Sequence, residues 1–135
     1  MNRVGWMVGT FLVMYLVATI LGFATHLFLN PLAMWISVFT IMPVLSALLI
    51  YAYLRKLRTT QQASLRESFW VAAVWIILSF GLDSIMYIAV IPFFSHGAPN
   101  WTLFRDQSPW IWLSYIVLLL SAFAAHSAYK RKAND

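Results

Sequence analysis

Apolar residues fill four long stretches of the chain, which alternate with short polar segments. The stretches run near residues 4–27, 31–54, 69–93 and 110–129. Each is long enough to cross the roughly 30 Å hydrocarbon core of a bilayer, which takes about 20 helical residues. Backbone groups in lipid must hydrogen-bond within their own segment, so these stretches form helices; barrel strands would be shorter and would alternate. The pattern predicts an all-α, integral membrane four-helix bundle of two transmembrane hairpins, with residues 1–135 as a single transmembrane domain.

Capping residues and prolines mark the ends of these helices. Asn-Pro at 30–31 and Ser-Pro at 108–109 each offer an N-cap followed by proline at the first helical position. The residues at 64–67 match a capping box, which begins the third helix about one turn before it enters the membrane. Pro43 predicts a kink within the second helix because it removes one hydrogen bond, and Pro92 is expected to end the third.

The composition supports a membrane location. Hydrophobic residues make up 62% of the chain and charged residues 10%, whereas an average soluble domain is about 25% charged. This excludes a disordered chain, a collagen, a coiled coil and a nucleic-acid-binding module. The absence of cysteine from the sequence excludes a disulfide scaffold and a thiolate metal site. The seven Trp residues fit the aromatic belts of a bilayer.

Basic residues lie almost entirely on one side of the four spans. Of the nine Lys and Arg residues, eight flank the predicted cytoplasmic ends and one lies on the other side. The positive-inside rule places both termini and the middle loop in the cytoplasm, in a multi-pass protein of the cell inner membrane. The apolar run of the first span is about twice as long as the usual hydrophobic region of a signal peptide, and no cleavage site follows it, so we expect it to be retained. The eight residues are Arg3, Arg55, Lys56, Arg58, Arg66, Lys130, Arg131 and Lys132; the ninth is Arg105.

Asp83 is the main candidate for a functional residue. It is the only acidic residue well inside a span, about 21 Å along the helix from Phe69 at 1.5 Å per residue. A charge in the membrane is costly, so an intramembrane carboxyl is a functional candidate by default. Desolvation favours its neutral form, which suits proton coupling and equally suits a structural acid. Its helix face predicts a stripe that faces other helices: Ala72, Ile76, Ser79, Asp83, Tyr87 and Val90.

Small and polar residues form matching stripes on the other spans. Counting depth along each helix places Thr19, Thr40 and Ser121 near the level of Asp83. One interpretation is a polar layer at the centre of the bundle, organised around Asp83. The alternative is that these residues only allow close helix packing, since Ser and Thr hydroxyls bond neighbouring carbonyl groups.

The histidines offer little basis for a metal or haem site. His26 ends the first span on the outer side, His96 lies in the outer loop, and His126 is near the cytoplasmic end of the fourth span. A haem or metal needs ligands at a common depth, which His126 does not share with the other two. His26 and His96 could meet at the outer surface, although histidines that reach toward the interface are commoner. No metal and no cofactor are predicted.

The segment between the third and fourth spans, near 94–109, is the longest non-helical piece. Its aromatic residues are typical of an anchor in the headgroup region. The alternative is a half-inserted lid over the outer mouth of the bundle, with Arg105 reaching a headgroup, a substrate or Asp83.

The third span resembles a pattern in small uncharacterised four-helix bacterial membrane proteins. Glu67, Trp75, Ser79, Leu82 and Asp83 form E-x7-W-x3-S-x2-L-D. The resemblance covers one helix and the hairpin layout. It implies a bacterial inner membrane and importance of Asp83, but no activity.

Three functions fit these observations. The first is a non-catalytic accessory or assembly subunit, because the chain is small and carries no catalytic motif. The second is a small homo-oligomeric transporter or channel that uses Asp83. The third is an enzyme acting on a lipid or quinone, with Asp83, His26 and Arg105 near the outer mouth. The predicted partners are the lipid bilayer and either a second copy or a larger membrane complex, and nucleic acid is not among them.

Overall fold

The computed structural model describes residues 2–57 and 65–134, and in this part of the chain all regular structure is helical. The first two long helices are α1 (Arg3–Phe28) and α2 (Pro31–Leu57). The third long helical run comprises α3 (Leu65–Asp83), a π-helix η1 (Ser84–Val90) and α4 (Ile91–Phe94). The short α5 (Leu103–Asp106) precedes the last long helix, α6 (Trp110–Asn134). The all-α prediction is confirmed.

The four long helical runs match the four predicted spans. Each contains a strongly apolar stretch with few charged residues. At about 1.5 Å per residue, each run is also long enough to cross a hydrocarbon core. The protein therefore has four helices that could span a membrane.

The predicted start of the second helix can be checked in full. The Asn30 side chain accepts a hydrogen bond from the backbone N–H of Ala33 at 2.8 Å, which confirms the N-cap of α2. The third helix begins at Leu65, but the first part of the predicted capping box, Ser64, lies outside the described residues. Pro43 lies inside α2, which is assigned as one helix from 31 to 57.

Pro92 lies in the last turn of the third helical run, which ends at Phe94, one residue beyond the predicted span. Proline has no N–H to donate to the carbonyl four residues earlier, which here belongs to Ile88. The backbone N–H of Asn100 donates to that carbonyl instead, at 3.0 Å. Ile88 lies in the π-helix η1, so this hydrogen bond attaches the loop after α4 to η1.

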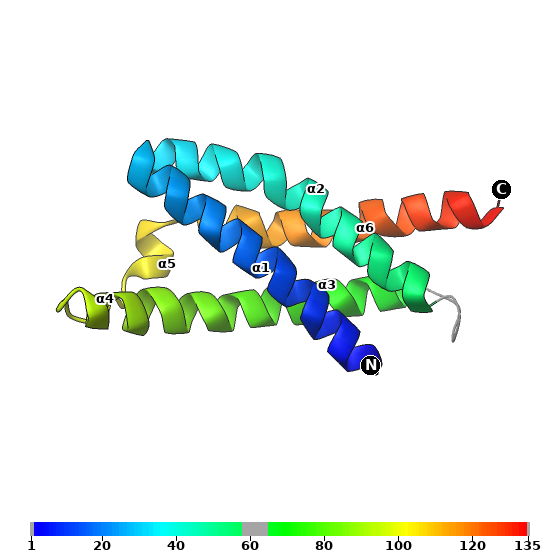
Figure 1. Ribbon diagram of the computed structural model, residues 1–135, viewed down its shortest axis with the longest axis horizontal. Coiled ribbons are helices and arrows are strands. Elements are labelled where there is room, and N and C mark those ends of the chain that lie inside the picture. Colours follow the sequence, from blue (N-terminus) through cyan, green and yellow to red (C-terminus); the bar gives the residue numbers. More distant parts are fainter. Residues whose placement is uncertain (1, 58–64, 135) are drawn as a thin grey trace.

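The helices form a bundle in which some pairs of long helices pack along each other and others touch only briefly. α1 packs along α2, α2 along α6, and α6 along α3. α1 and α3 touch only briefly. Both termini lie toward one end of the bundle, here called the termini end (Figure 1). The turn between α1 and α2 and the 95–109 segment lie at the opposite end, here called the loop end (Figure 1).

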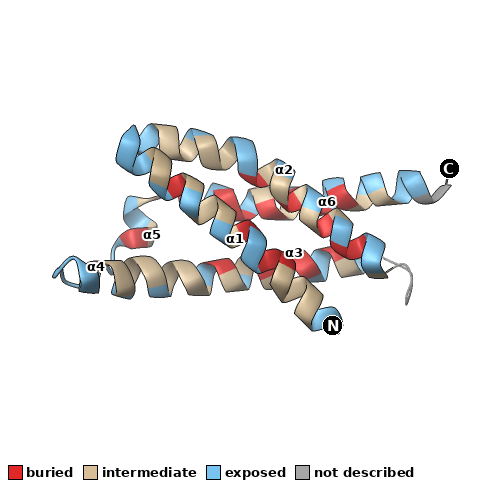
Figure 2. Ribbon diagram, in the orientation of Figure 1, coloured by how far each residue is buried: buried red, intermediate tan, exposed pale blue. Residues whose placement is uncertain are grey.

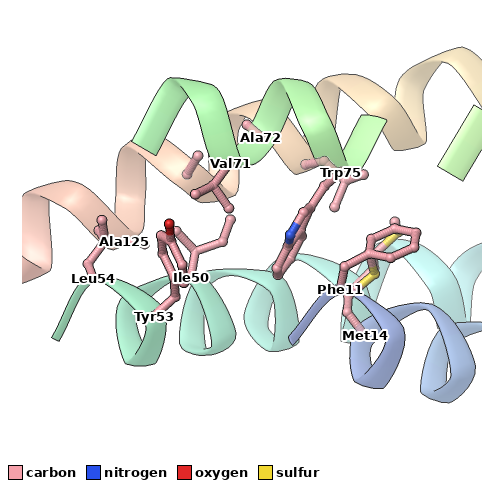
Figure 3. Close-up of a cluster of buried hydrophobic side chains, with 12 residues drawn as sticks. Phe11, Met14, Ile50, Tyr53, Leu54, Val71, Ala72, Trp75 and Ala125 are labelled. Atoms are coloured by element: carbon pink, nitrogen blue, oxygen red, sulfur yellow. The ribbon is translucent and has the colours of Figure 1, made fainter. Parts of the chain in front are cut away.

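The tightly packed core lies where the helices cross and toward the termini end (Figure 2). Trp75 extends from α3 toward α1 (Figure 3), where its ring centroid is 6.1 Å from that of Phe11. Its indole N–H donates to the backbone oxygen of Met7 at 3.2 Å. The core comprises Phe11, Met14, Met42, Ile50, Tyr53, Leu54, Val71, Ala72, Trp75, Leu118, Ala122 and Ala125.

Trp75→Ala is expected to destabilise the protein by roughly 3 kcal/mol, at the low end of the range for deleting a large buried ring, because lipid is as apolar as the core. Thermal unfolding in detergent measures the effect. Ile77→Ala is the control, since Ile77 is on the same helix but 67% exposed. Equal melting temperatures for the two variants would contradict the placement of the core.

Candidate functional site

The carboxyl group of Asp83 is hydrogen-bonded by two tyrosines from two other helices. Tyr15 of α1 donates its hydroxyl to Oδ1 at 2.9 Å. Tyr115 of α6 donates to Oδ2 at 2.7 Å. A polar group in an apolar environment is costly unless it is hydrogen-bonded, and here each carboxyl oxygen has a phenol partner. Asp83 therefore connects α3 to both α1 and α6.

Asp83 forms no ion pair with any described residue. The salt bridges of the described chain join Arg3 to Glu67 at the termini end and Arg105 to neighbouring Asp106 in α5. The carboxyl is therefore held by neutral donors alone. This leaves it suited to interact with a cation that comes from outside the chain.

Asp83 lines a cavity of about 690 Å³ in the loop-end half of the bundle. This volume lies within the range of about 300–1,000 Å³ that is common for ligand sites. The walls come from α1, α2, the end of the α3–α4 run, the 95–109 segment and the start of α6. They are mostly apolar. The wall reaches exposed residues such as Leu27, Pro31 and Gly97, so the cavity opens at the loop end.

Several predicted candidates converge on this cavity. Ser79, Asp83 and Tyr87 of the predicted stripe line it, together with Thr19 and His26 of α1. The Tyr87 ring stacks on Phe23, with 6.3 Å between ring centroids. The other three residues of the stripe, Ala72, Ile76 and Val90, do not line the cavity.

Ser79 differs from most other helical serines and threonines. Its side chain lies one turn before Asp83 and only 3% of the residue is exposed, yet its hydroxyl has no hydrogen-bond partner in the described chain. Most of the others donate to a carbonyl three or four residues earlier in their own helix, including Thr10, Thr25, Ser37, Thr40, Ser84 and Ser121.

Thr40 and Ser121 do not join the predicted polar layer. Thr40 is exposed on α2 and donates to the carbonyl of Ile36 at 2.7 Å. Ser121 is buried but donates to Val117 of its own helix, also at 2.7 Å, and neither residue lines the cavity. Depth counting gives the level of a residue and not its direction. A hydroxyl that bonds its own helix needs no partner on another helix.

The 95–109 segment forms part of the cavity wall. Leu103 is buried and lines the cavity together with Asn100 and Gln107. Phe104 stacks on Phe80 of α3 with 4.8 Å between ring centroids. These contacts favour the lid over a simple headgroup anchor.

The proposed reach of Arg105 toward Asp83 is wrong. The Arg105 side chain is 81% exposed and pairs with Asp106 at 3.5 Å, and it does not line the cavity. It lies on the outward side of α5, whereas Leu103 lies on the inward side. A helix as short as α5 presents its residues to both sides, so sequence alone did not indicate which would point inward.

Sequence reasoning missed the part played by Tyr115. On the fourth span the candidate residue was Ser121, and Tyr115 was not among the candidates. Tyrosine hydroxyls in apolar surroundings usually have a hydrogen-bond partner. A tyrosine at the depth of a lone carboxyl was therefore a usable signal.

The termini end is held together by a second polar cluster. Arg3 pairs with Glu67 through two contacts, one of them Nε to Oε1 at 3.0 Å. Tyr53 donates to the same Oε1 at 2.7 Å. Lys56 lies over the Trp6 ring, with 5.7 Å from Nζ to the ring centroid. These contacts connect α1, α2 and α3 beside the packed core.

The three histidines have different surroundings. His26 lies on the cavity wall, His96 in the loop with a φ of 56°, and His126 within 3.4 Å of Ser68. Across residues 2–57 and 65–134, no three His, Cys, Asp or Glu side chains are grouped so that they could hold a metal ion.

No protein-family model, no curated protein and no solved structure matches the chain. The kind of protein it is can therefore be described only from its own helices and cavity. It is an all-helical protein with four helices that could cross a membrane and a hydrogen-bonded carboxyl group in a cavity. The resemblance of residues 67–83 to small bacterial membrane proteins stays a prediction.

Tyr115→Phe is expected to lower the free energy of unfolding by about 1 kcal/mol, the usual magnitude for a hydrogen bond between membrane helices. In an Asp83→Ala background the same change should cost almost nothing, because the acceptor is gone. Thermal unfolding of the four proteins in detergent measures this coupling.

Tyr51→Phe serves as the control, since the Tyr51 hydroxyl has no hydrogen bond to a described residue. An equal effect of Tyr115→Phe in both backgrounds would argue against the bond to Asp83.

Proposed function

We propose that this is a small transporter of the inner membrane, whose ligand enters the cavity from outside the cell and is anchored by Asp83. One observation carries the proposal: a hydrogen-bonded carboxyl without an ion-pair partner among the described residues lines a cavity of about 690 Å³. A carboxyl needed only for packing would not require such a space beside it. An intramembrane acid on a cavity is the usual arrangement of a substrate or ion pathway.

The distribution of basic residues supports the orientation. Of the eight Lys and Arg residues in the described chain, seven lie toward the termini end. The positive-inside rule puts this end in the cytoplasm. The cavity, which opens at the loop end, then faces the outside.

The two halves of the bundle support an outward-open state. The loop-end half contains the cavity, and the termini-end half contains the packed core and the Arg3–Glu67–Tyr53 cluster. Transport across the membrane requires the second half to open while the first closes, as in alternating access. The cavity lies within one chain, so ligand binding does not need a second copy.

The other two functions predicted from sequence have weaker support. An accessory or assembly subunit stays a prediction, and nothing about such a role calls for a cavity beside Asp83. An enzyme needs a base and a reacting group in reach of each other. His26 and Asp83 line one cavity, but Arg105, the third member of that hypothesis, points away from it.

Cysteine labelling tests the open cavity and its direction, and the chain has no native cysteine to interfere. Ala18 lines the cavity, so Ala18→Cys should react with a charged, membrane-impermeant thiol reagent added outside intact cells. Ala122→Cys is the matched control, because Ala122 lies in the packed core and is 2% exposed. It should stay unlabelled.

Labelling of Ala18→Cys only from the cytoplasmic side of inverted vesicles would reverse the proposed orientation. Failure to label from either side would contradict an open cavity, and with it the proposed function.

A further inference from the structure

We infer that the ligand carries a protonated amine, which binds between the hydroxyl of Ser79 and the carboxyl of Asp83, and an apolar tail that fills the rest of the cavity. This inference rests on the proposed function, since it identifies the chemical class of the ligand for the same cavity. The two residues lie one turn apart on the same face of α3.

The hydroxyl of Ser79 has no hydrogen-bond partner in the described chain. A buried polar group without a partner is costly, and most comparable hydroxyls here avoid that cost by bonding their own helix. Ser79 lines the cavity, but its oxygen is covered, so a ligand donor reaches it when the hydroxyl turns toward the cavity. Ser46 also has a buried hydroxyl without a partner in the described chain, but it does not line the cavity, so of the two only Ser79 is placed to bond a ligand there.

The Asp83 carboxyl also has remaining capacity to accept hydrogen bonds. An ionised carboxyl group offers about four acceptor positions, and the phenols of Tyr15 and Tyr115 occupy two. A primary ammonium group has three N–H donors. One can go to Asp83 and another to Ser79, which satisfies both residues with a single group.

The character of the cavity walls also supports an amine with an apolar tail. Aromatic rings of Tyr15, Phe23 and Tyr87 line the cavity, and aromatic faces attract organic cations. The methionines Met14, Met34 and Met42 add flexible, polarisable surface that adapts to an alkyl chain. No described Lys or Arg lines the cavity, and its one wall histidine, His26, is an exposed residue.

Charge also selects against the alternatives. An anionic ligand would place a second negative group beside Asp83, which is unfavourable in a medium of low dielectric constant. A neutral alcohol could bond Ser79, but it would add no charge to balance the carboxylate. A quaternary ammonium has the charge and lacks the N–H donors that the pair of residues would accept.

The test compares four probes of equal chain length: octylamine, octyltrimethylammonium, octanol and octanoate. Binding to the protein in lipid nanodiscs is followed by calorimetry, with empty nanodiscs to subtract partitioning into lipid. We expect octylamine to bind most tightly. Asp83→Asn should weaken its binding at least about tenfold, and Ser79→Ala about fivefold, the equivalent of one hydrogen bond.

Matched variants separate these effects from general damage. Asp106→Asn and Ser121→Ala change the same residue types outside the cavity, and both should bind octylamine as the unmodified protein does. Ser79→Ala should leave the binding of octyltrimethylammonium unchanged, because that probe has no N–H to lose. This comparison carries the test even if Asp83→Asn does not fold.

If octanol or octanoate binds as tightly as octylamine, the inference that the ligand carries an amine is wrong, although the cavity remains a ligand site. The same conclusion follows if Ser79→Ala does not weaken the binding of octylamine. If no probe binds while Ala18→Cys is labelled from outside, the amine inference fails and the open cavity stands. If neither occurs, the proposed function fails as well.

Discussion

A carboxyl group within an apolar helix bundle has to be hydrogen-bonded, and the way Asp83 meets this requirement determines the loop-end half of the molecule. Its two oxygens take hydroxyls from Tyr15 of α1 and Tyr115 of α6. The three helices must therefore stay at a distance that two tyrosine side chains can bridge. Tyrosine is long, so this arrangement holds the helices together around Asp83 while leaving space beside it, and that space is part of the cavity.

In the termini-end half of the bundle, by contrast, side chains fill the space between the helices. Trp75 and the residues around it are fully buried, and Arg3 and Glu67 pair beside them. Among the described residues, the cluster of core side chains does not extend to the loop end. There the 95–109 segment completes the wall of the cavity. That segment is attached through the carbonyl of Ile88, which accepts from the backbone N–H of Asn100 and cannot accept from Pro92, four residues further on.

Hydropathy and helical spacing predicted the four helices and the face of α3 that carries Asp83, because both signals are local to one segment. The placement of Thr40 and Ser121 was wrong because it required the rotation of each helix against its neighbours, which one segment does not contain. The direction of Arg105 on the short α5 also depends on how that helix is rotated against its neighbours. So does the direction of Tyr115, which was missed although its hydroxyl needed a partner. The π-helix after Asp83 has no signal in the sequence beyond the proline that follows it.

The Asp83 carboxyl lines a cavity that opens at the loop end, so water should reach it. Water-edited solid-state NMR of protein with ¹³C-labelled aspartate in lipid bilayers measures this directly, with the Asp83 signal assigned by its loss in Asp83→Asn. We expect magnetisation from water to reach the Asp83 carboxyl almost as fast as it reaches that of Asp106, which is exposed at the loop end. Transfer as slow as that to the aliphatic carbons of the packed core would contradict it.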